Sequence, residues 1–357
     1  MSAKNSTPAP PRVTAETARA LVAAAHQVFQ LTPWKFMDDR HLVGLRDDLT
    51  GELRVATVMG SLGEVFGVAV NRGPSGLGWI HKLATRQNDP EDPAAYMEAL
   101  DALKAEWVKK SEMEAPDLAL LTAAGFKPAG HGCVWPKFQS SSPGWVPWFV
   151  TELDARQLTA DLAKMARLAE LFLRTPALFA TCKRGEIAVV PAGTGPLRSD
   201  QIEWLPMVPP PTPVLTPVRF SAAEAAQLGA LPVRADTVFE FTAPLVPEMA
   251  YMDAEVGRPC LGRLALLSDR ASYFIFSCEA LGGHRPLAEL TGSVLKQGLV
   301  AAGVRPQAIH VDREELVAVL QPACAAIGIP VRQVEKLPAA HDAVANLTGK
   351  LAQTPRH

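Results

Sequence analysis

The chain has 357 residues, of which 48% are hydrophobic and 20% charged, and this composition is typical of a folded protein of about two domains. The formal net charge of −2 gives no overall attraction to nucleic acid or to an anionic membrane, so we expect neither as a partner. The five cysteines are scattered and never spaced Cys-x-x-Cys, which is typical of reduced thiols in a cytoplasmic protein. No apolar run approaches the roughly 18 residues of a membrane span. We expect residues 1–12 to form a disordered leader that is not a signal peptide.

The first predicted domain covers residues 13–205, and its most regular part is a glycine-punctuated stretch over 45–78. Apolar runs alternate there with glycines, which supply the positive φ angles of tight turns, so we expect an antiparallel meander. Residues 126–150 show no clear period, and we expect an irregular segment there. The other expected elements are strands near 42–47, 52–60, 64–71 and 186–190, and flanking helices over 14–31, 93–110, 117–124 and 154–174.

A proline-rich segment, residues 206–217, separates this domain from a second one over 218–352. Proline at this density favours polyproline II, so the segment is either a linker or a rigid loop on the surface of one domain. In the second domain we expect a capping box of Ser221 and Glu224, strands near 237–244, 261–268, 272–280, 307–311 and 331–335, and helices over 286–302, 313–327 and 339–351. The order β-β-β-α-β-α-β-α predicts a mixed sheet, and the fold class of the whole chain is α+β.

Two stretches carry a resemblance to known proteins: VMGSLGEVFGVAVNRGPSGL, and the region from RPCLGRLALLSD through VRPQAIHVDREELVAVLQPACAAIGIPV to the closing helix. They resemble bacterial proteins that pair two uncharacterised domains. The resemblance implies two domains and a bacterial origin, and it implies no activity.

The strand order of the second domain is similar to that of the ribonuclease H superfamily, whose nucleases hold two divalent metals between clustered carboxylates. That similarity implies Mg²⁺ or Mn²⁺ and a metal-dependent phosphodiesterase, with candidate catalytic acids Asp269, Glu289, Asp312 and Asp342 (or His341). If strand 237–244 comes first in the sheet, however, Asp269 falls on the second strand and the superfamily's first acid has no match.

Local structure accounts for the presence of acidic residues at three of these positions without any metal. Asp312 and Glu315 form a capping box for the following helix, Asp269 lies in a hairpin turn, and Glu289 lies in the first turn of a helix, where acids are favoured. The sequence therefore favours a structural role for these carboxylates.

Other patterns give no assembled site. His310 and Asp312 alternate on one strand, and His131 lies two residues from Cys133, but neither pair has a visible third ligand, so we expect no metal site. The glycines at 60–63 and 257–262 precede strands, where no helix could complete a phosphate loop. No Gly-x-Ser-x-Gly motif occurs, and the cysteines have the character of small core residues.

The aromatic residues are unevenly distributed, since six of the seven tryptophans lie before residue 150. Trp135, Phe138, Trp145 and Trp148 lie in one Pro/Gly/Ser-rich stretch, where they form either a surface for a ligand or partner or ordinary packing over the meander. Since no catalytic set is assembled, we expect a non-enzymatic binding or interaction protein without a cofactor. Its partner would be a protein or small ligand, bound through residues 133–149.

Overall fold

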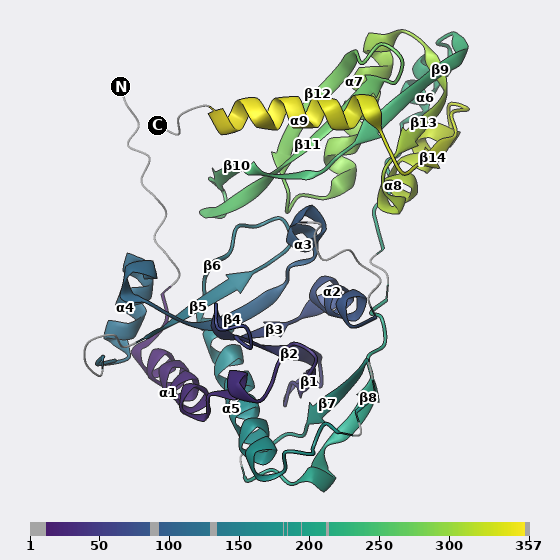
Figure 1. Cartoon of the computed structure of the whole chain (residues 1–357). Helices are drawn as coiled ribbons and strands as arrows, with labels where there is room; N and C mark the ends of the chain where they lie inside the picture. Colours follow the sequence, from purple (N-terminus) through teal and green to yellow (C-terminus); the bar gives the residue numbers. More distant parts are fainter. Residues whose placement is uncertain are drawn as a thin grey trace, which may run out of the picture. The chain divides into compact units, whose positions relative to one another are not determined.

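The computed structural model describes residues 12–85, 93–128, 134–180, 182–183, 185–193, 195–211 and 214–353. It contains two compact units, the first formed by Met1–Pro143 with Pro147–Thr212 and the second by Gly144–Val146 with Pro213–His357. Each unit combines a sheet with helices, which confirms the α+β fold class (Figure 1). Apart from Arg12, the predicted leader lies outside the described residues. No helix in the described part of the chain is long and apolar enough to cross a membrane.

The first unit is built on an eight-stranded sheet with the order β6-β5-β4-β3-β2-β1-β7-β8. The pair β1–β7 is parallel and the other neighbours are antiparallel. Residues 73–78 of the predicted meander begin a helix instead, but its first three strands are confirmed as the central part of the sheet. Gly51, Gly60 and Gly63 adopt positive φ angles of 73°, 119° and 80° in its turns. The strands are β1 (Val43–Arg46), β2 (Leu53–Met59), β3 (Phe66–Asn71), β4 (Ala102–Val108), β5 (Trp135–Ser141), β6 (Trp148–Phe149), β7 (Glu186–Val190) and β8 (Glu203–Pro206).

Helices lie on both faces of this sheet. The larger apolar core joins one face to α1 and α5, and a smaller core joins the other face to α2 and α3. The α-helices are α1 (Ala15–Leu31), α2 (Gly73–Thr85), α3 (Pro93–Ala99), α4 (Ala115–Ala123) and α5 (Glu152–Arg174), and 3₁₀ turns cover Pro33–Lys35, Lys110–Glu112 and Ser199–Gln201.

Two further sequence predictions for this unit are wrong. The helix expected over 93–110 is a short helix, α3, followed by strand β4, in which Leu103, Ala105 and Trp107 alternate as buried residues. A helical period fits Leu100, Leu103 and Trp107 equally well. The segment forms a strand because β4 pairs with β3 on one side and β5 on the other. The segment 126–150, expected to be irregular, contains the regular strand β5.

Buried ion pairs fasten α5 to the meander. Asp161 on α5 is completely buried, and its two oxygens accept hydrogen bonds from Nε and Nη2 of Arg54 on β2, at 3.0 and 2.8 Å. Arg54 also pairs with Asp47 at 3.0 Å. Because a buried charge without a partner is costly, these contacts hold the helix in one register on the sheet.

The start of α1 is joined to the start of α5 through Glu152, which predicts an acid-sensitive contact. Glu152 accepts hydrogen bonds from the Thr17 hydroxyl at 2.6 Å and from the Thr14 backbone N–H at 2.8 Å. These two bonds lower the pKa of Glu152 from 4.5 to about 2. Because the pKa of Glu152 is lower in the folded chain than in the unfolded one, its ionised carboxylate stabilises the fold at pH values above the pKa of the unfolded state. This contribution disappears as the pH falls towards 2.

We therefore expect Glu152→Gln to reduce the free energy of unfolding at pH 7, and the difference from the parent to vanish between about pH 5 and pH 2. Chemical unfolding at a series of pH values measures this. Glu170→Gln on the same helix is the control, because Glu170 accepts only a weak 3.5 Å hydrogen bond from Gln27, and its loss should change the free energy of unfolding little. A difference from the parent that stayed constant with pH would contradict the assignment.

The second unit is built on a six-stranded mixed sheet with the order β10-β11-β9-β13-β14, in which β12 also pairs with β11. The pairs β9–β13 and β13–β14 are parallel, and the pairs of β11 are antiparallel. The mixed sheet is thus confirmed. Four strands precede the first crossover helix, where three were predicted, and the strand that was missed is β10. The elements are α6 (Ala222–Gly229), β9 (Val233–Thr242), β10 (Leu245–Asp253), β11 (Arg258–Asp269), β12 (Ile275–Gly282), α7 (Leu287–Ala302), β13 (Arg305–Val311), α8 (Glu314–Ala325), β14 (Val331–Gln333) and α9 (Pro338–Gln353).

Different helices pack on the two faces of this sheet. One face packs Phe239, Phe241 and Val311 into the core with α7 and α8. The other face lies under α9, which crosses the antiparallel strands (Figure 1). Ala340 of α9 and Leu337 just before it pack against Leu266 of the sheet.

One capping prediction in this unit is confirmed and another is wrong. The Ser221 side chain accepts from the Glu224 N–H and the Glu224 side chain accepts from the Ser221 N–H, as expected. Helix α8 instead begins after Arg313 without a side-chain cap, so Asp312 and Glu315 form no capping box. The Asp312 carboxylate accepts a hydrogen bond from the Thr242 hydroxyl at 2.7 Å, because the chain leaves β13 beside β9.

Candidate functional site

The hairpin of β10 and β11 places three polar side chains on one face of the sheet of the second unit. Tyr251 is paired directly with Cys260, and Asp253 with Arg258. Since directly paired residues, and residues two apart on one strand, share a face, Tyr251, Asp253 and Cys260 point to the same side. The Asp253 Oδ1 accepts from the backbone N–H groups of Glu255 and Val256 in the turn, which leaves Oδ2 available.

Strand β12 brings a histidine to the same place. Gly282 pairs with Gly262, and the pairing continues through a 2.7 Å hydrogen bond from the Gly283 N–H to the Leu261 carbonyl. The next residue, His284, therefore comes beside Cys260, and its Nε2 lies 3.3 Å from Asp253 Oδ2.

Asp253, Cys260 and His284 together offer one ligand atom each, and these three atoms lie within 4.8 Å of one another. Among the described residues they are the one group of three His, Cys, Asp or Glu side chains this close. Cys260 is completely buried, while the side chains of His284 and Asp253 are 15% and 13% exposed. The buried Nδ1 of His284 has no hydrogen-bond partner in the described part of the chain. We call these three residues the Asp–Cys–His centre.

Neighbouring groups hold the imidazole in position. The Trp145 ring, which belongs to the second unit, stacks on His284 with ring centroids 4.0 Å apart, and the Arg258 guanidinium lies 5.3 Å from the Trp145 ring. A Cβ at Gly282 would lie only 2.6 Å from His284 Cε1, so glycine is required there for the ring to fit.

The protonation states of the centre follow from its burial. Burial raises the pKa of the Cys260 thiol and lowers the pKa of His284. The backbone N–H groups of Val256 and Glu255 lower the pKa of Asp253 despite some desolvation. At neutral pH the centre thus holds a thiol, a neutral imidazole and a carboxylate. A buried, protonated thiol is a poor nucleophile, so the arrangement does not suit covalent catalysis.

The four predicted catalytic acids do not form such a group. Asp269 accepts hydrogen bonds from the N–H and hydroxyl of Ser272, as expected for a hairpin turn, and Glu289 pairs with Arg285 at 2.6 Å. Asp312 contacts Thr242 and lies 3.3 Å from His341 Nε2, while Asp342 is exposed on α9.

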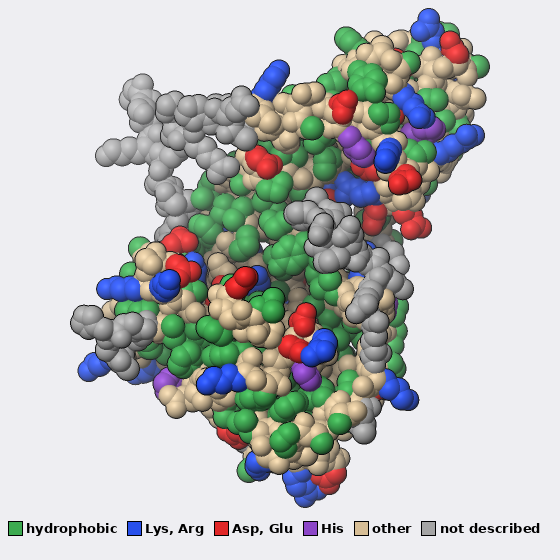
Figure 2. Space-filling view, viewed as in Figure 1, with side chains coloured by type: hydrophobic (Ala, Val, Ile, Leu, Met, Phe, Trp, Pro, Cys, Tyr) green, Lys and Arg blue, Asp and Glu red, His purple; other side chains and the backbone are tan. Residues whose placement is uncertain are grey.

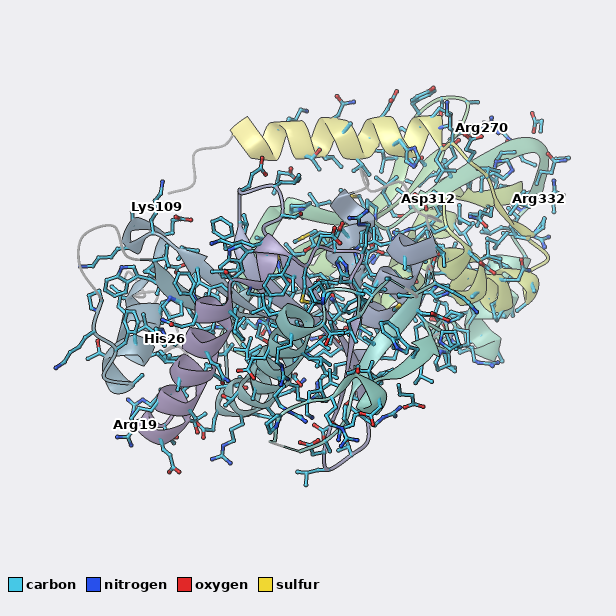
Figure 3. The ribbon with its side chains drawn as sticks, turned by 60° about the horizontal axis from the view of Figure 1, so that its bottom comes forward. Arg19, His26, Lys109, Arg270, Asp312 and Arg332 are labelled. Carbon is cyan, nitrogen blue, oxygen red and sulfur yellow. The ribbon has the colours of Figure 1, made fainter. Side chains whose placement is uncertain are left out.

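Glu240 on β9 is an acid that sequence reasoning missed. It is completely buried, and its Oε2 accepts from the Ala339 and Ala340 N–H groups at the start of α9, at 2.8 and 3.1 Å. Arg270 lies 3.7 Å from the other oxygen, and Figure 3 shows Arg270 and Asp312 on the side where α9 begins. Arginine, histidine and acidic side chains mix on the surface there (Figure 2). The sequence signal that could have identified Glu240 is its position as the one charged residue in the apolar run Val-Phe-Glu-Phe.

The predicted aromatic residues separate into different environments. Phe138 is 3% exposed in the core of the first unit, and Trp135 packs against that core. Trp148 is half-buried beside Phe149, and Trp145 stacks on His284. A buried Phe138 cannot contact a partner, so these four residues do not make one binding surface. The predicted pair His131 and Cys133 lies outside the described residues.

Two sequence families cover most of the chain. Residues 19–189 match the family described as "Domain of unknown function (DUF7309)", and residues 224–348 match "Domain of unknown function (DUF6930)". A comparison with curated proteins finds no match. The two matches cover separate parts of the chain, in agreement with the resemblance to proteins that pair two uncharacterised domains.

Proposed function

We propose that this protein acts by binding rather than by catalysis, and that its second unit holds a divalent transition metal, preferably Zn²⁺, at the Asp–Cys–His centre. The observation that carries the proposal is the convergence of one possible ligand atom from each of the three side chains within 4.8 Å. Because the thiol must stay reduced, we place the protein in the bacterial cytoplasm.

The chemistry of the three donors supports this choice of metal. Thiolate sulfur, imidazole nitrogen and carboxylate oxygen are the ligands that Zn²⁺ uses in proteins, whereas Mg²⁺ and Ca²⁺ require mainly oxygen. Tetrahedral Zn²⁺ with its usual bond lengths places an oxygen and a nitrogen ligand about 3.3 Å apart. The observed separation of Asp253 Oδ2 and His284 Nε2 is 3.3 Å. With three protein ligands, the fourth position is available to water or a small ligand.

Calorimetric titration of the reduced full chain with Zn²⁺ tests the proposal. We expect one ion per chain, and loss of this binding in Cys260→Ser and in Asp253→Asn. The matched controls are Cys278→Ser, an exposed thiol on β12, and Asp269→Asn, another carboxylate that closes a hairpin turn. Zn²⁺ binding with unchanged affinity in Cys260→Ser would overturn the proposal.

A second candidate function, a metal-dependent phosphodiesterase using Mg²⁺ or Mn²⁺, is favoured by one observation. Glu240 and Asp312 each have a buried oxygen without a hydrogen-bond partner within the described residues. This candidate predicts Mn²⁺ binding that Asp312→Asn removes, together with hydrolysis of a phosphodiester. Retention of Mn²⁺ binding in Asp312→Asn would exclude it.

A further inference from the structure

We propose that Tyr251 is a positioning residue of the Asp–Cys–His centre, holding the Cys260 sulfur in the orientation in which it binds the metal. This inference rests on the metal binding proposed above, and it adds a residue that controls the affinity of the centre.

An irregularity in β10 brings the tyrosine to this place. Val246 pairs with Gly262, but the register then shifts, and Tyr251 pairs with Cys260. Had the first register continued, the residue opposite Cys260 would be Glu248. The bulge therefore replaces a second carboxylate with a phenol beside the sulfur, and bulges near functional sites commonly redirect side chains in this way.

The Tyr251 hydroxyl reaches the ligands themselves. Tyr251 and Cys260 are directly paired across the hairpin, and the interaction of their side chains contributes to the pKa shifts of both groups. A Cβ at Gly282 would lie 3.2 Å from this hydroxyl oxygen and 2.9 Å from His284 Nδ1, so both groups border the space that the glycine leaves open. The hydroxyl and the imidazole thus face the same small space, and Tyr251 is the cross-strand neighbour of Cys260.

A side chain that does not coordinate the metal can still orient a metal ligand by hydrogen-bonding to it. Loss of such a bond typically costs 10–100-fold in metal affinity. Tyr251→Phe removes only the hydroxyl and keeps the ring, and since Tyr251 is 45% exposed we expect the fold to tolerate the change. Tyr273→Phe is a matched control, because Tyr273 is 48% exposed in the same unit and lies in the turn between β11 and β12.

Zn²⁺ titration and Co²⁺ absorption of the full chain test the inference. We expect Tyr251→Phe to bind Zn²⁺ about 10–100-fold more weakly and to change the thiolate-to-cobalt absorption band. Tyr273→Phe should match the parent in both. Equal affinities and an unchanged cobalt band in Tyr251→Phe would overturn the inference, while absence of Zn²⁺ binding in the parent would instead refute the proposed function. If Tyr251→Phe unfolds more easily without metal, the cobalt band of its folded fraction decides: an altered band supports the inference and an unaltered band overturns it.

Discussion

Replacing Asp161 with alanine should lower the free energy of unfolding of the first unit by about 3–5 kcal/mol, because it leaves a buried guanidinium partly unpaired. The Arg54 side chain is only 3% exposed, and Asp161 supplies two of its hydrogen bonds. Its remaining partner, Asp47, is 26% exposed and lies at 3.0 Å. Urea unfolding followed by tryptophan fluorescence measures the effect, because Trp145 is the one tryptophan of the seven outside the first unit.

Two comparisons separate this ion pair from general damage. Asp200→Ala breaks an exposed pair with Arg198 and should leave the unfolding curve almost unchanged. Combining Arg54→Met with Asp161→Leu should recover most of the loss, because apolar residues of similar size do not need a charged partner. An Asp161→Ala protein within about 1 kcal/mol of the parent would contradict the buried pair.

Zn²⁺ at about 100 times its dissociation constant should raise the free energy of unfolding of the second unit by about 2.7 kcal/mol, because the metal binds only the folded arrangement. The three ligands come from the ends of β10 and β12 and the start of β11, which an unfolded chain does not hold together. Calorimetry of the full chain with and without Zn²⁺ measures this shift.

The matched variants give the control for this stabilisation. Cys260→Ser should lose the shift, and Cys278→Ser should keep it, since the Cys278 thiol is exposed and lies outside the centre. Equal stabilisation of both variants would show that Zn²⁺ acts elsewhere on the protein.

Elements with local signals could be predicted from the sequence. The meander turns depend on glycines whose φ angles are positive, and helix α6 depends on a capping box of residues three apart. Both signals lie within a few residues, so no tertiary knowledge is needed to interpret them. The wrong helix over 93–110 shows the limit, because the apolar spacing of that segment fits either element and its sheet neighbours decide between them.

The candidate site could not be predicted in the same way. Asp253, Cys260 and His284 have no spacing typical of a metal motif, and they meet only through the registers of three strands. One of these strands, β10, was not predicted, so the hairpin that aligns Tyr251 with Cys260 was not visible. Trp145 was singled out from composition, but its contact with His284 joins residues more than a hundred positions apart.

The most direct test of the Asp–Cys–His centre is a crystal structure of the reduced protein with Zn²⁺, using anomalous scattering at the zinc absorption edge. We predict one strong anomalous peak at about 2.0–2.3 Å from the sulfur of Cys260, a nitrogen of His284 and an oxygen of Asp253. A structure from the same crystals without a peak at these three side chains, or with zinc bound at other residues, would contradict the account.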